Sequence, residues 1–292
     1  MIKVAVVIVT YNRANLLEKT INAVLRQTVN PEIIYIINNS STDKTIEVCE
    51  KISFLSNIKI NLINKKVNDG GAGGFADGLE FFLQNDDVNY CWMMDDDVEP
   101  DADCLENLLA YTSFSDFIHP SRYYEDGREQ GWRQIYMPSL GYSVSLKCSD
   151  DYDVYATNVG CFEGCLISKK IVNKLGIPFR DFFIAEDDTL YGFLASFSTP
   201  VLLVNKAKMK RLIKPNNIIP AWKIFYIIRN KIWMLKIIYR KEFLGKVNYF
   251  TNIYGLLLFI VFIMKYNKFN GFFKIIKGVK DGVLKNPDIL KK

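Results

Sequence analysis

The chain of 292 residues is 49% hydrophobic and 24% charged, which is a globular composition and excludes a disordered chain. Its net charge of +5 conceals an uneven distribution, because residues 206–292 carry 20 of the 37 basic side chains and only 3 of the 32 acidic ones. An acidic body, residues 1–205, is thus followed by a basic and aromatic C-terminal part. Anionic lipid and nucleic acid are the usual partners of such a part. Since the sequence contains no recognisable nucleic-acid-binding module, we expect an anionic membrane surface and no nucleic acid.

The six cysteines do not form a metal-binding pattern. No two have CxxC spacing, and the single histidine, His119, is not near a cysteine pair, which argues against a zinc site. We expect reduced thiols in a cytosolic compartment. The apolar run that starts at Val4 ends at Thr10, which is too short for a signal peptide and fits a buried first strand.

Strands and helices alternate through the first hundred residues. The apolar patterns predict strands at 4–9, 32–37, 59–64 and 90–94, and helices at 16–26, 42–52 and 74–83. Ser41 or Thr42 is expected near the N-cap of the second helix. This order predicts an α/β fold with a mostly parallel, Rossmann-like sheet, in which ligands bind at the carboxyl ends of the strands.

The later segments are less regular. We expect loops and short strands around an acceptor pocket at 114–153, a strand pair within 159–168, and a helix within 181–195. The composition changes near Pro215. We therefore expect a catalytic domain at 1–215 and a basic, aromatic, helical region at 216–292.

Three consecutive aspartates, Asp95–Asp97, follow the apolar strand 90–94. Because side chains alternate along a strand, Asp95 and Asp97 are expected on one face and Asp96 on the other. Paired carboxylates suit Mg²⁺ or Mn²⁺. The alternative is an acidic turn that caps a helix starting at Glu99-Pro100-Asp101.

Two further clusters have a functional and a structural interpretation. The segment 68–75 is rich in glycine between a strand and a helix, so it either lets backbone N–H groups approach a ligand or forms a flexible turn. Glu186, Asp187 and Asp188 follow an apolar run. Crowded carboxylates shift one another's pKa, which suits a general base, but acidic residues are also common in the first turn of a helix.

Five motifs together resemble the inverting family-2 glycosyltransferases of the GT-A fold. They are Val-Ile-Val-Thr-Tyr-Asn-Arg at 7–13, Asn-Asn-Ser-Ser-Thr-Asp at 38–43, the glycine segment, Asp95–Asp97 and Glu186–Asp188. Within that family, Gly-Gly-Ala-Gly-Gly-Phe followed by Trp-Met-Met-Asp-Asp-Asp resembles the bacterial galactofuranosyltransferases, and the rhamnosyltransferases share a weaker version.

The resemblance implies a nucleotide-sugar donor, and UDP-galactofuranose in particular. The residues that it places around the donor are Thr10, Asn12, Arg13, Asn38, Gly73, Gly74, Asp95 and Asp96. Among these, Asn38 is at the position that usually contacts the base, and Asp96 is at one that contacts the ribose or the sugar.

The resemblance also implies a metal and a base. Asp95 and Asp97 would hold Mn²⁺ or Mg²⁺ on the diphosphate. Asp188 would deprotonate the acceptor hydroxyl and Asp187 would bind the acceptor. Trp132 and Glu186 are further candidates for acceptor contacts.

The sequence departs from the family pattern in three places. Asn38 stands where the family usually has Asp, and Leu190 where an acidic residue is common. No histidine follows Asp188 by some twenty residues; the side chains in that region are Lys206, Lys208, Lys210 and Arg211. Water would then complete the coordination shell of the metal, or these cations would take over part of the diphosphate charge.

The C-terminal region mixes cationic and aromatic residues over Trp222–Tyr239, as in helices that lie on a membrane surface. The apolar stretch Ile253–Met264 is shorter than the roughly 20 residues of a membrane span, which favours an interfacial or a core helix. A basic helical dimerisation region, and hence a homo-oligomer, is the alternative.

The expected function is transfer of galactofuranose to a hydroxyl of a lipid-linked oligosaccharide for a surface polysaccharide such as capsule or O-antigen. The enzyme would act in the cytoplasm, peripherally on the inner face of a bacterial cell membrane. A rhamnosyltransferase that uses dTDP-rhamnose, a nucleotidyltransferase and a non-catalytic membrane-binding module are the alternatives.

Overall fold

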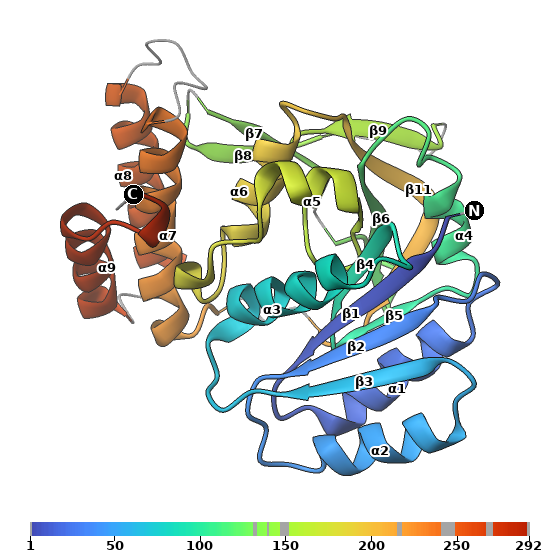
Figure 1. The fold of residues 1–292 in the computed structure, drawn as a ribbon. Coiled ribbons are helices and arrows are strands. Elements are labelled where there is room, and N and C mark those ends of the chain that lie inside the picture. The colour runs from blue at the N-terminus through green and yellow to red at the C-terminus, as the bar shows by residue number, and fades with distance from the viewer. Residues whose placement is uncertain are drawn as a thin grey trace.

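A nine-stranded mixed sheet forms the centre of the protein (Figure 1). The computed structural model describes residues 2–130, 133–138, 140–146, 152–214, 218–240, 249–266 and 271–290. The strand order is β3-β2-β1-β4-β10-β6-β11-β5, and β9 also pairs with β11. The first half of the sheet is parallel and matches the sequence expectation; its strands are β1 (Val4–Thr10), β2 (Ile33–Asn38), β3 (Lys59–Asn64) and β4 (Tyr90–Asp95).

The second half of the sheet is mixed. Its strands are β5 (Val98–Pro100), β6 (Phe117–Tyr124), β9 (Val154–Thr157), β10 (Leu166–Ser168) and β11 (Val201–Arg211). Strand β10 runs antiparallel between β4 and β6, whereas β11 is parallel to β6 and antiparallel to β5 and β9. A separate hairpin consists of β7 (Gln134–Met137) and β8 (Tyr142–Ser145).

Helices cover both faces of the sheet because the strands of its parallel half are apolar on both sides. Along β1, Ile8 belongs to a buried cluster with Leu17 of α1, whereas Val7 belongs to a second cluster with Leu79 of α3. Helices α1 (Ala14–Leu25), α2 (Thr45–Leu55) and α4 (Cys104–Leu109) contribute to the first cluster. Helices α3 (Gly70–Gln84), α5 (Lys169–Leu175) and α6 (Asp187–Ala195) contribute to the second.

Two expected helix starts were wrong. Helix α3 begins at Gly70, four residues before the expected start, so the glycine segment is the first turn of the helix and not a free turn. Glycine at position 74 lets α3 approach β1, since a Cβ atom there would lie 2.5 Å from Val9 Cγ1. Helix α2 begins at Thr45, and its first turn is bound by Asp43, which accepts hydrogen bonds from the Thr45 N–H and hydroxyl at 3.1 and 2.6 Å.

Three other sequence expectations were wrong. Residues 98–100 form β5 and not the start of a helix, and only 166–168 of the expected strand pair within 159–168 is a strand. The segment 117–124, expected to be loops and short strands, is a central strand whose polar side chains are buried with partners. Thus His119 Nε2 lies 3.3 Å from Thr157 Oγ1, and burial lowers the pKa of His119 to about 3, which makes it a neutral structural residue.

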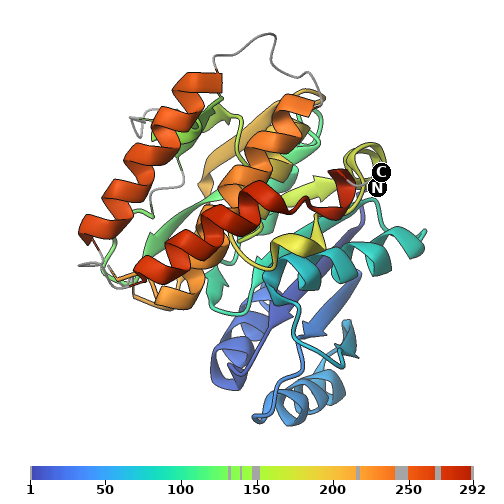
Figure 2. The ribbon, with the colours of Figure 1, turned by 90° about the vertical axis from the view of Figure 1, so that its left-hand side faces the viewer.

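The C-terminal part consists of α7 (Ala221–Arg240), α8 (Tyr249–Tyr266) and α9 (Phe272–Leu284), which gather on one flank of the sheet (Figure 2). Trp233 and Ile237 of α7 share a buried cluster with Phe182 and Leu190 of the body. Within the described ranges, no helix combines the length and apolarity that a membrane crossing needs. The expected domain boundary at Pro215 lies outside the described residues.

Helix α7 also holds the segment that leads into α6. Phe183, Ala185 and Glu186 have φ of 63°, 70° and 68°, a left-handed region that costs non-glycine residues free energy. The fully buried Asn230 of α7 offsets this cost, because its amide nitrogen lies 2.8–2.9 Å from the carbonyl oxygens of Phe182, Ile184 and Ala185. The turn before α6 therefore depends on the C-terminal region.

Replacing Asn230 by Ala should lower the free energy of unfolding by about 2–3 kcal/mol, since it leaves buried carbonyl groups without a donor. Urea unfolding followed by circular dichroism measures the change. The control is Asn57→Ala at an exposed position, which should change stability by less than about 0.5 kcal/mol. Equal stability of the two variants would contradict this role of Asn230.

Candidate active site

One cavity of about 980 Å³ opens beside the carboxyl ends of β1 and β4. Its wall near these strands includes Thr10, Arg13, Asn39, Asp95, Asp96 and Asp97. The segments 161–163 and 183–189 line its middle. Side chains of the three C-terminal helices line its far end. The cavity thus connects the aspartate triplet with the acidic cluster before α6, as ligand sites at strand ends would require.

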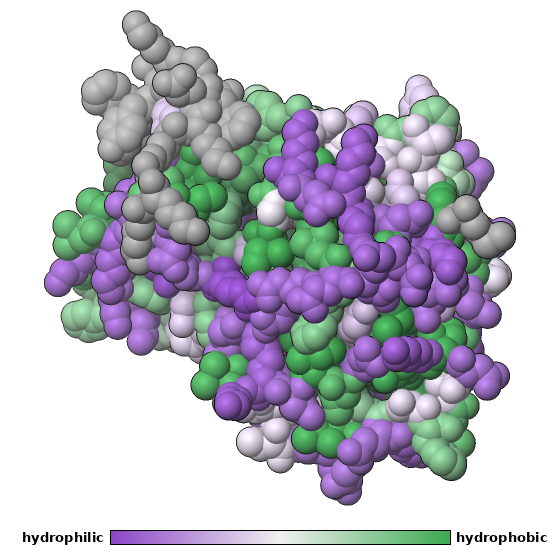
Figure 3. All heavy atoms as spheres, viewed as in Figure 1, coloured by the Kyte–Doolittle hydropathy of each residue, from purple (hydrophilic) through white to green (hydrophobic). Residues whose placement is uncertain are grey.

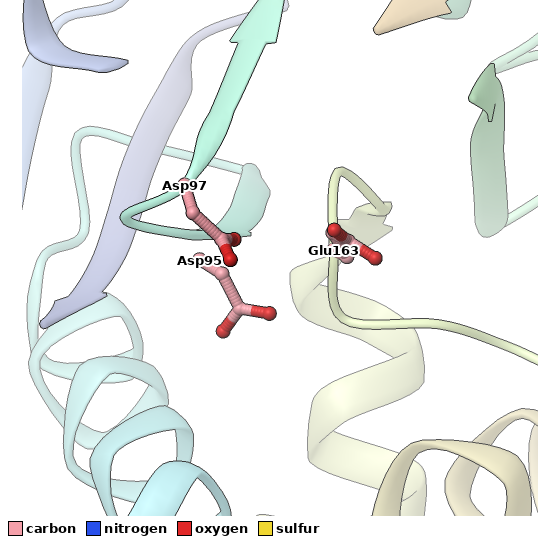
Figure 4. A group of neighbouring side chains, drawn as sticks. All are labelled: Asp95, Asp97 and Glu163. Atoms are coloured by element: carbon pink, nitrogen blue, oxygen red, sulfur yellow. The ribbon is translucent and has the colours of Figure 1, made fainter. Parts of the chain in front are cut away.

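Three carboxylates converge on this cavity. Ligand oxygens of Asp95, Asp97 and Glu163 all lie within 4.8 Å of one another, with the two aspartates at the end of β4 and the glutamate across from them on the loop before β10 (Figure 4). Asp97 Oδ1 and Glu163 Oε1 are buried and accept no hydrogen bond from the described residues. Burial, followed by repulsion from Asp97 and Glu163, raises the pKa of Asp95 well above its ordinary value. Hard, crowded oxygens with unused lone pairs fit Mg²⁺ or Mn²⁺.

Two arginines flank the carboxylates. Arg13 lies 3.0 Å from an oxygen of Asp96 and 3.1 Å from one of Asp97. Arg211 lies 3.9 Å from Asp97 and 3.4 Å from Glu163. Of the four side chains Lys206, Lys208, Lys210 and Arg211, Arg211 is the one that lines the cavity. The arginines offset part of the negative charge and leave room for a divalent ion.

Asp96 does not belong to this group of three; strand β4 ends at Asp95, so the strand alternation expected from the sequence does not extend to Asp96 and Asp97. Asp96 is 3% exposed, and its oxygens accept hydrogen bonds from the Thr10 hydroxyl at 2.7 Å, the Tyr11 N–H at 3.3 Å and Arg13 at 3.0 Å. In this structure Asp96 therefore fixes the end of β1 and orients Arg13. A contact between Asp96 and the donor stays a prediction.

Asn12 and Asn38 hold the loops that follow β1 and β2. The Asn12 side chain accepts a hydrogen bond from the Thr42 N–H at 2.7 Å. Buried Asn38 donates to Asn64 at 2.8 Å and accepts from the Ser41 N–H at 3.0 Å. Neither asparagine lines the cavity, so their expected contacts with the nucleotide remain predictions.

Residues close in sequence to the expected Asn38, Gly73 and Gly74 line the cavity instead. Asn39 lines it, with its side-chain oxygen buried and without a hydrogen-bond partner among the residues that the structure describes. Gly70 and Gly71 line it as well, whereas Gly73 and Gly74 are buried inside α3. Trp132, an expected acceptor contact, lies outside the described residues.

The second acidic cluster lies at the first turn of α6. Burial raises the pKa of both Asp187 and Asp188, and the charge of Asp188 raises that of Asp187 further. The Asp188 side chain accepts a hydrogen bond from the Thr189 N–H at 2.7 Å, which orients it. Glu186 forms an ion pair with Lys231 of α7 at 3.0 Å. A carboxylate with a raised pKa beside the cavity can act as a general base.

Sequence reasoning missed Glu163 and Asn230. Glu163 is the one charged residue within 159–167, an otherwise apolar and small-residue stretch, and that isolation was the available signal. For Asn230 the signal was an amide between Arg229 and Lys231 in a helix otherwise rich in aliphatic and aromatic residues. The described cysteines are free thiols and are buried; Cys148 lies outside the described residues.

Comparison with known sequences identifies a family. The model of glycosyl transferase family 2 matches residues 5–176. The O-antigen chain rhamnosyltransferase RfbN of Salmonella typhimurium is 31% identical over 112 residues, which are 38% of this chain and 33% of that protein. The galactofuranosyltransferase GlfT1 of Mycolicibacterium smegmatis is 25% identical over 197 residues, covering 63% of this chain and 62% of that one. The chain thus spans less than two thirds of the length of either relative.

Solved structures show the same fold at low sequence identity. GalNAc-T7 with UDP, GalNAc and Mn²⁺ superposes with a TM-score of 0.63 at 14% identity, covering 81% of this chain and 48% of that chain. The mannosyltransferase PcManGT from Pyrobaculum calidifontis, in complex with GDP-Man and Mn²⁺, superposes with a TM-score of 0.61 at 14% identity. The match covers 95% of this chain and 73% of that chain. These similarities confirm the GT-A-like fold expected from the sequence.

The family model covers more than half of the chain, and it includes the strand ends that carry Asp95 and Asp97 as well as the loop that carries Glu163. The protein therefore belongs to glycosyl transferase family 2.

Proposed function

We propose that the protein is a metal-dependent, inverting glycosyltransferase that moves a sugar from a nucleotide diphosphate to an acceptor hydroxyl. One observation carries this proposal: the carboxylates of Asp95, Asp97 and Glu163 share a cavity with Asp188. The three carboxylates suit a cation that binds a diphosphate, and Asp188 suits removal of a proton from the acceptor. Membership of glycosyl transferase family 2 supports sugar transfer over nucleotidyl transfer.

The end of the cavity beside β4 would bind the donor. Asp95, Asp97 and Glu163 would hold Mn²⁺ or Mg²⁺, which when bound neutralises the diphosphate and stabilises it as a leaving group. Arg13 and Arg211 add fixed positive charge beside the same carboxylates. These groups are in place before the reaction, so little reorganisation accompanies the departure of the nucleoside diphosphate.

Asp188 would act on the acceptor. Its carboxylate accepts the proton of the acceptor hydroxyl while that oxygen attacks the anomeric carbon from the face opposite the diphosphate. The new glycosidic bond forms as the bond to the diphosphate oxygen breaks, which inverts the anomeric configuration. Asp187, whose pKa is raised further by the charge of Asp188, is suited to donate a hydrogen bond to the acceptor in its protonated form.

For the sugar, we propose galactofuranose from UDP-galactofuranose, with a lipid-linked oligosaccharide of a surface polysaccharide as the acceptor. The similarity to a galactofuranosyltransferase over 62% of that protein supports this choice. The second candidate, rhamnose from dTDP-rhamnose, is favoured by the similarity to a rhamnosyltransferase at higher identity over a shorter segment.

Both candidates are tested in one assay, in which the purified protein receives each donor with Mn²⁺ and a lipid-linked acceptor analogue. Mass spectrometry and NMR identify the product and its anomeric configuration. We expect transfer from UDP-galactofuranose with inversion. Transfer from dTDP-rhamnose alone would select the second candidate, and release of pyrophosphate without sugar transfer would contradict both.

The raised pKa of Asp188 predicts an acidic limb in the pH–rate profile. A base must be ionised to act, so transfer should be lost as the pH falls through this raised pKa, well above the ordinary carboxyl value of about 4. Above this pKa, Asp188→Asn should lower the transfer rate by about 10²–10⁴-fold, and the acidic limb should be absent from the variant. UDP binding, measured by calorimetry, should be retained. A wild-type profile that is flat down to pH 4 would contradict the assignment of Asp188.

We also propose that the protein lies peripherally on the cytoplasmic face of the membrane. Tyr254, Leu257 and Val261 of α8 are 64%, 55% and 62% exposed, and recur at helical spacing. Hydrophobic and hydrophilic residues lie side by side over α9 at the left edge of the molecule (Figure 3). Apolar side chains beside lysines suit the interface of an anionic bilayer.

Val261→Glu combined with Leu257→Glu should lower binding to phosphatidylglycerol-containing vesicles at least tenfold, since each carboxylate repels the anionic surface and enters it poorly. Co-sedimentation measures binding. Phe54→Glu is the matched control, because Phe54 is 89% exposed on α2, which packs on the sheet. If all three proteins sediment alike, α8 is not the membrane contact.

A further inference from the structure

The far end of the cavity is basic and is built from the C-terminal helices. Lys223 of α7 and both Lys274 and Lys277 of α9 line it. Within the described ranges, no carboxylate lies within 4.0 Å of these three ammonium groups. The one acidic residue of α9, Asp281, pairs with Lys285 at 2.9 Å. Lys277 is near enough to help lower the pKa of Asp281, but none of the three lysines forms an ion pair within the described ranges, so together they present positive charge to the cavity.

The proposed donor does not need these lysines. Its diphosphate lies, under the proposed function, beside Asp95, Asp97 and Glu163, where Arg13 and Arg211 already supply positive charge. The segment that leads into α6 lines the same cavity and contacts α7, where Asn230 donates to the Ala185 carbonyl and Lys231 pairs with Glu186. The lysines are thus on the acceptor side of the base. A neutral saccharide carries no negative charge that three lysines at this place could bind.

Aromatic side chains accompany the lysines. Trp222 is 50% exposed and lines the cavity with Phe225 and Tyr226. The ammonium group of Lys277 lies 5.5 Å from the centre of the Phe225 ring, which holds the lysine at the cavity wall. Tyr226 stacks on Phe183, with ring centroids 4.7 Å apart, and so connects this wall to the segment before α6.

Exposed apolar side chains lie next to these lysines along α9. Phe273 and Ile276 of α9 alternate with Lys274 and Lys277 and are 83% and 50% exposed. A ligand at the lysines would therefore have saccharide chemistry on one side, at Asp188, and apolar surface on the other. A molecule in which a phosphate joins a sugar to a hydrocarbon chain would place its sugar at Asp188, its phosphate at the lysines and its chain on the apolar surface.

We propose that Lys223, Lys274 and Lys277 bind the phosphate groups of an acceptor whose saccharide is joined through a diphosphate to a long isoprenoid-like chain. This inference rests on the proposed function, because it takes Asp188 as the base that faces the acceptor. Under this proposal the C-terminal helices help to select the acceptor, in addition to contacting the membrane. Phosphate beside hydrocarbon also occurs in phospholipid headgroups, so the experiment must separate the two sources.

The test uses the full-length protein with UDP and Mg²⁺ at saturating concentrations, so that the donor end is occupied. Farnesyl diphosphate, a short isoprenoid diphosphate, is titrated below its micellar concentration by calorimetry. We expect it to bind the wild type, and Lys274→Gln combined with Lys277→Gln to raise its Kd at least tenfold. Lys223→Gln should raise it by a smaller factor. All of these changes remove charge at the cavity wall without altering the core.

The matched control is Lys280→Gln, which removes one charge from α9 at an exposed position that does not line the cavity. It should leave the Kd unchanged, and an equal loss in this control would show a non-specific charge effect and overturn the proposal. A second arm replaces farnesyl diphosphate by soluble dihexanoyl phosphatidylglycerol. If this headgroup binds equally tightly and is lost in the same variants, the lysines form a membrane-lipid site and the proposal fails.

UDP titration separates this inference from the proposed function. If the wild type binds UDP but not farnesyl diphosphate, the acceptor site is wrong and the donor site stands. If the wild type does not bind UDP with Mg²⁺, the proposed function itself fails.

Discussion

Repulsion among buried carboxylates is the constraint on which the site depends. Asp95, Asp97 and Glu163 lie within 4.8 Å of one another, in an environment that disfavours charge. Arg13 and Arg211 compensate part of this charge from two sides. Free lone pairs on Asp97 and Glu163 remain for a cation. Under the proposed function, a divalent ion would offset the negative charge that the arginines leave and would allow an anionic donor to bind.

The second constraint is the left-handed backbone before α6. Phe183 also contacts α3, since its carbonyl oxygen accepts a hydrogen bond from the Ala72 N–H at 3.1 Å. Gly70 has φ of 80°, and a Cβ atom there would lie 2.0 Å from the Phe183 oxygen, so glycine is required at this position. With Asn230 on the other side, the segment that positions Asp188 is held between α3 and α7. The C-terminal region is thus structurally part of the active site.

Residues with strong local signals could be predicted from the sequence. Apolar runs such as 4–9 and 59–64 identified the strands of the parallel half, and the polar clusters after β1 and β4 identified the edge where the cavity lies. Glu163 could not be found in this way, because it reaches Asp95 through the pairing of β10 with β4, which brings together residues distant in the sequence. Strand β6 was missed since His119 and Arg122 are polar, and their burial depends on tertiary partners. Gly73 and Gly74 have strong local signals, and in this structure Gly74 lets α3 approach β1, whereas Gly73 leaves room for the carboxylate of Asp69.

A crystal structure with UDP and Mn²⁺, using anomalous scattering to locate the metal, tests the central claim most directly. The account predicts one manganese peak within about 2.0–2.4 Å of carboxylate oxygens of Asp95, Asp97 and Glu163, the range expected for a hard divalent ion. It also predicts that the diphosphate completes the coordination on the side facing Asp188. A manganese ion bound elsewhere, or bound without Glu163, would contradict it.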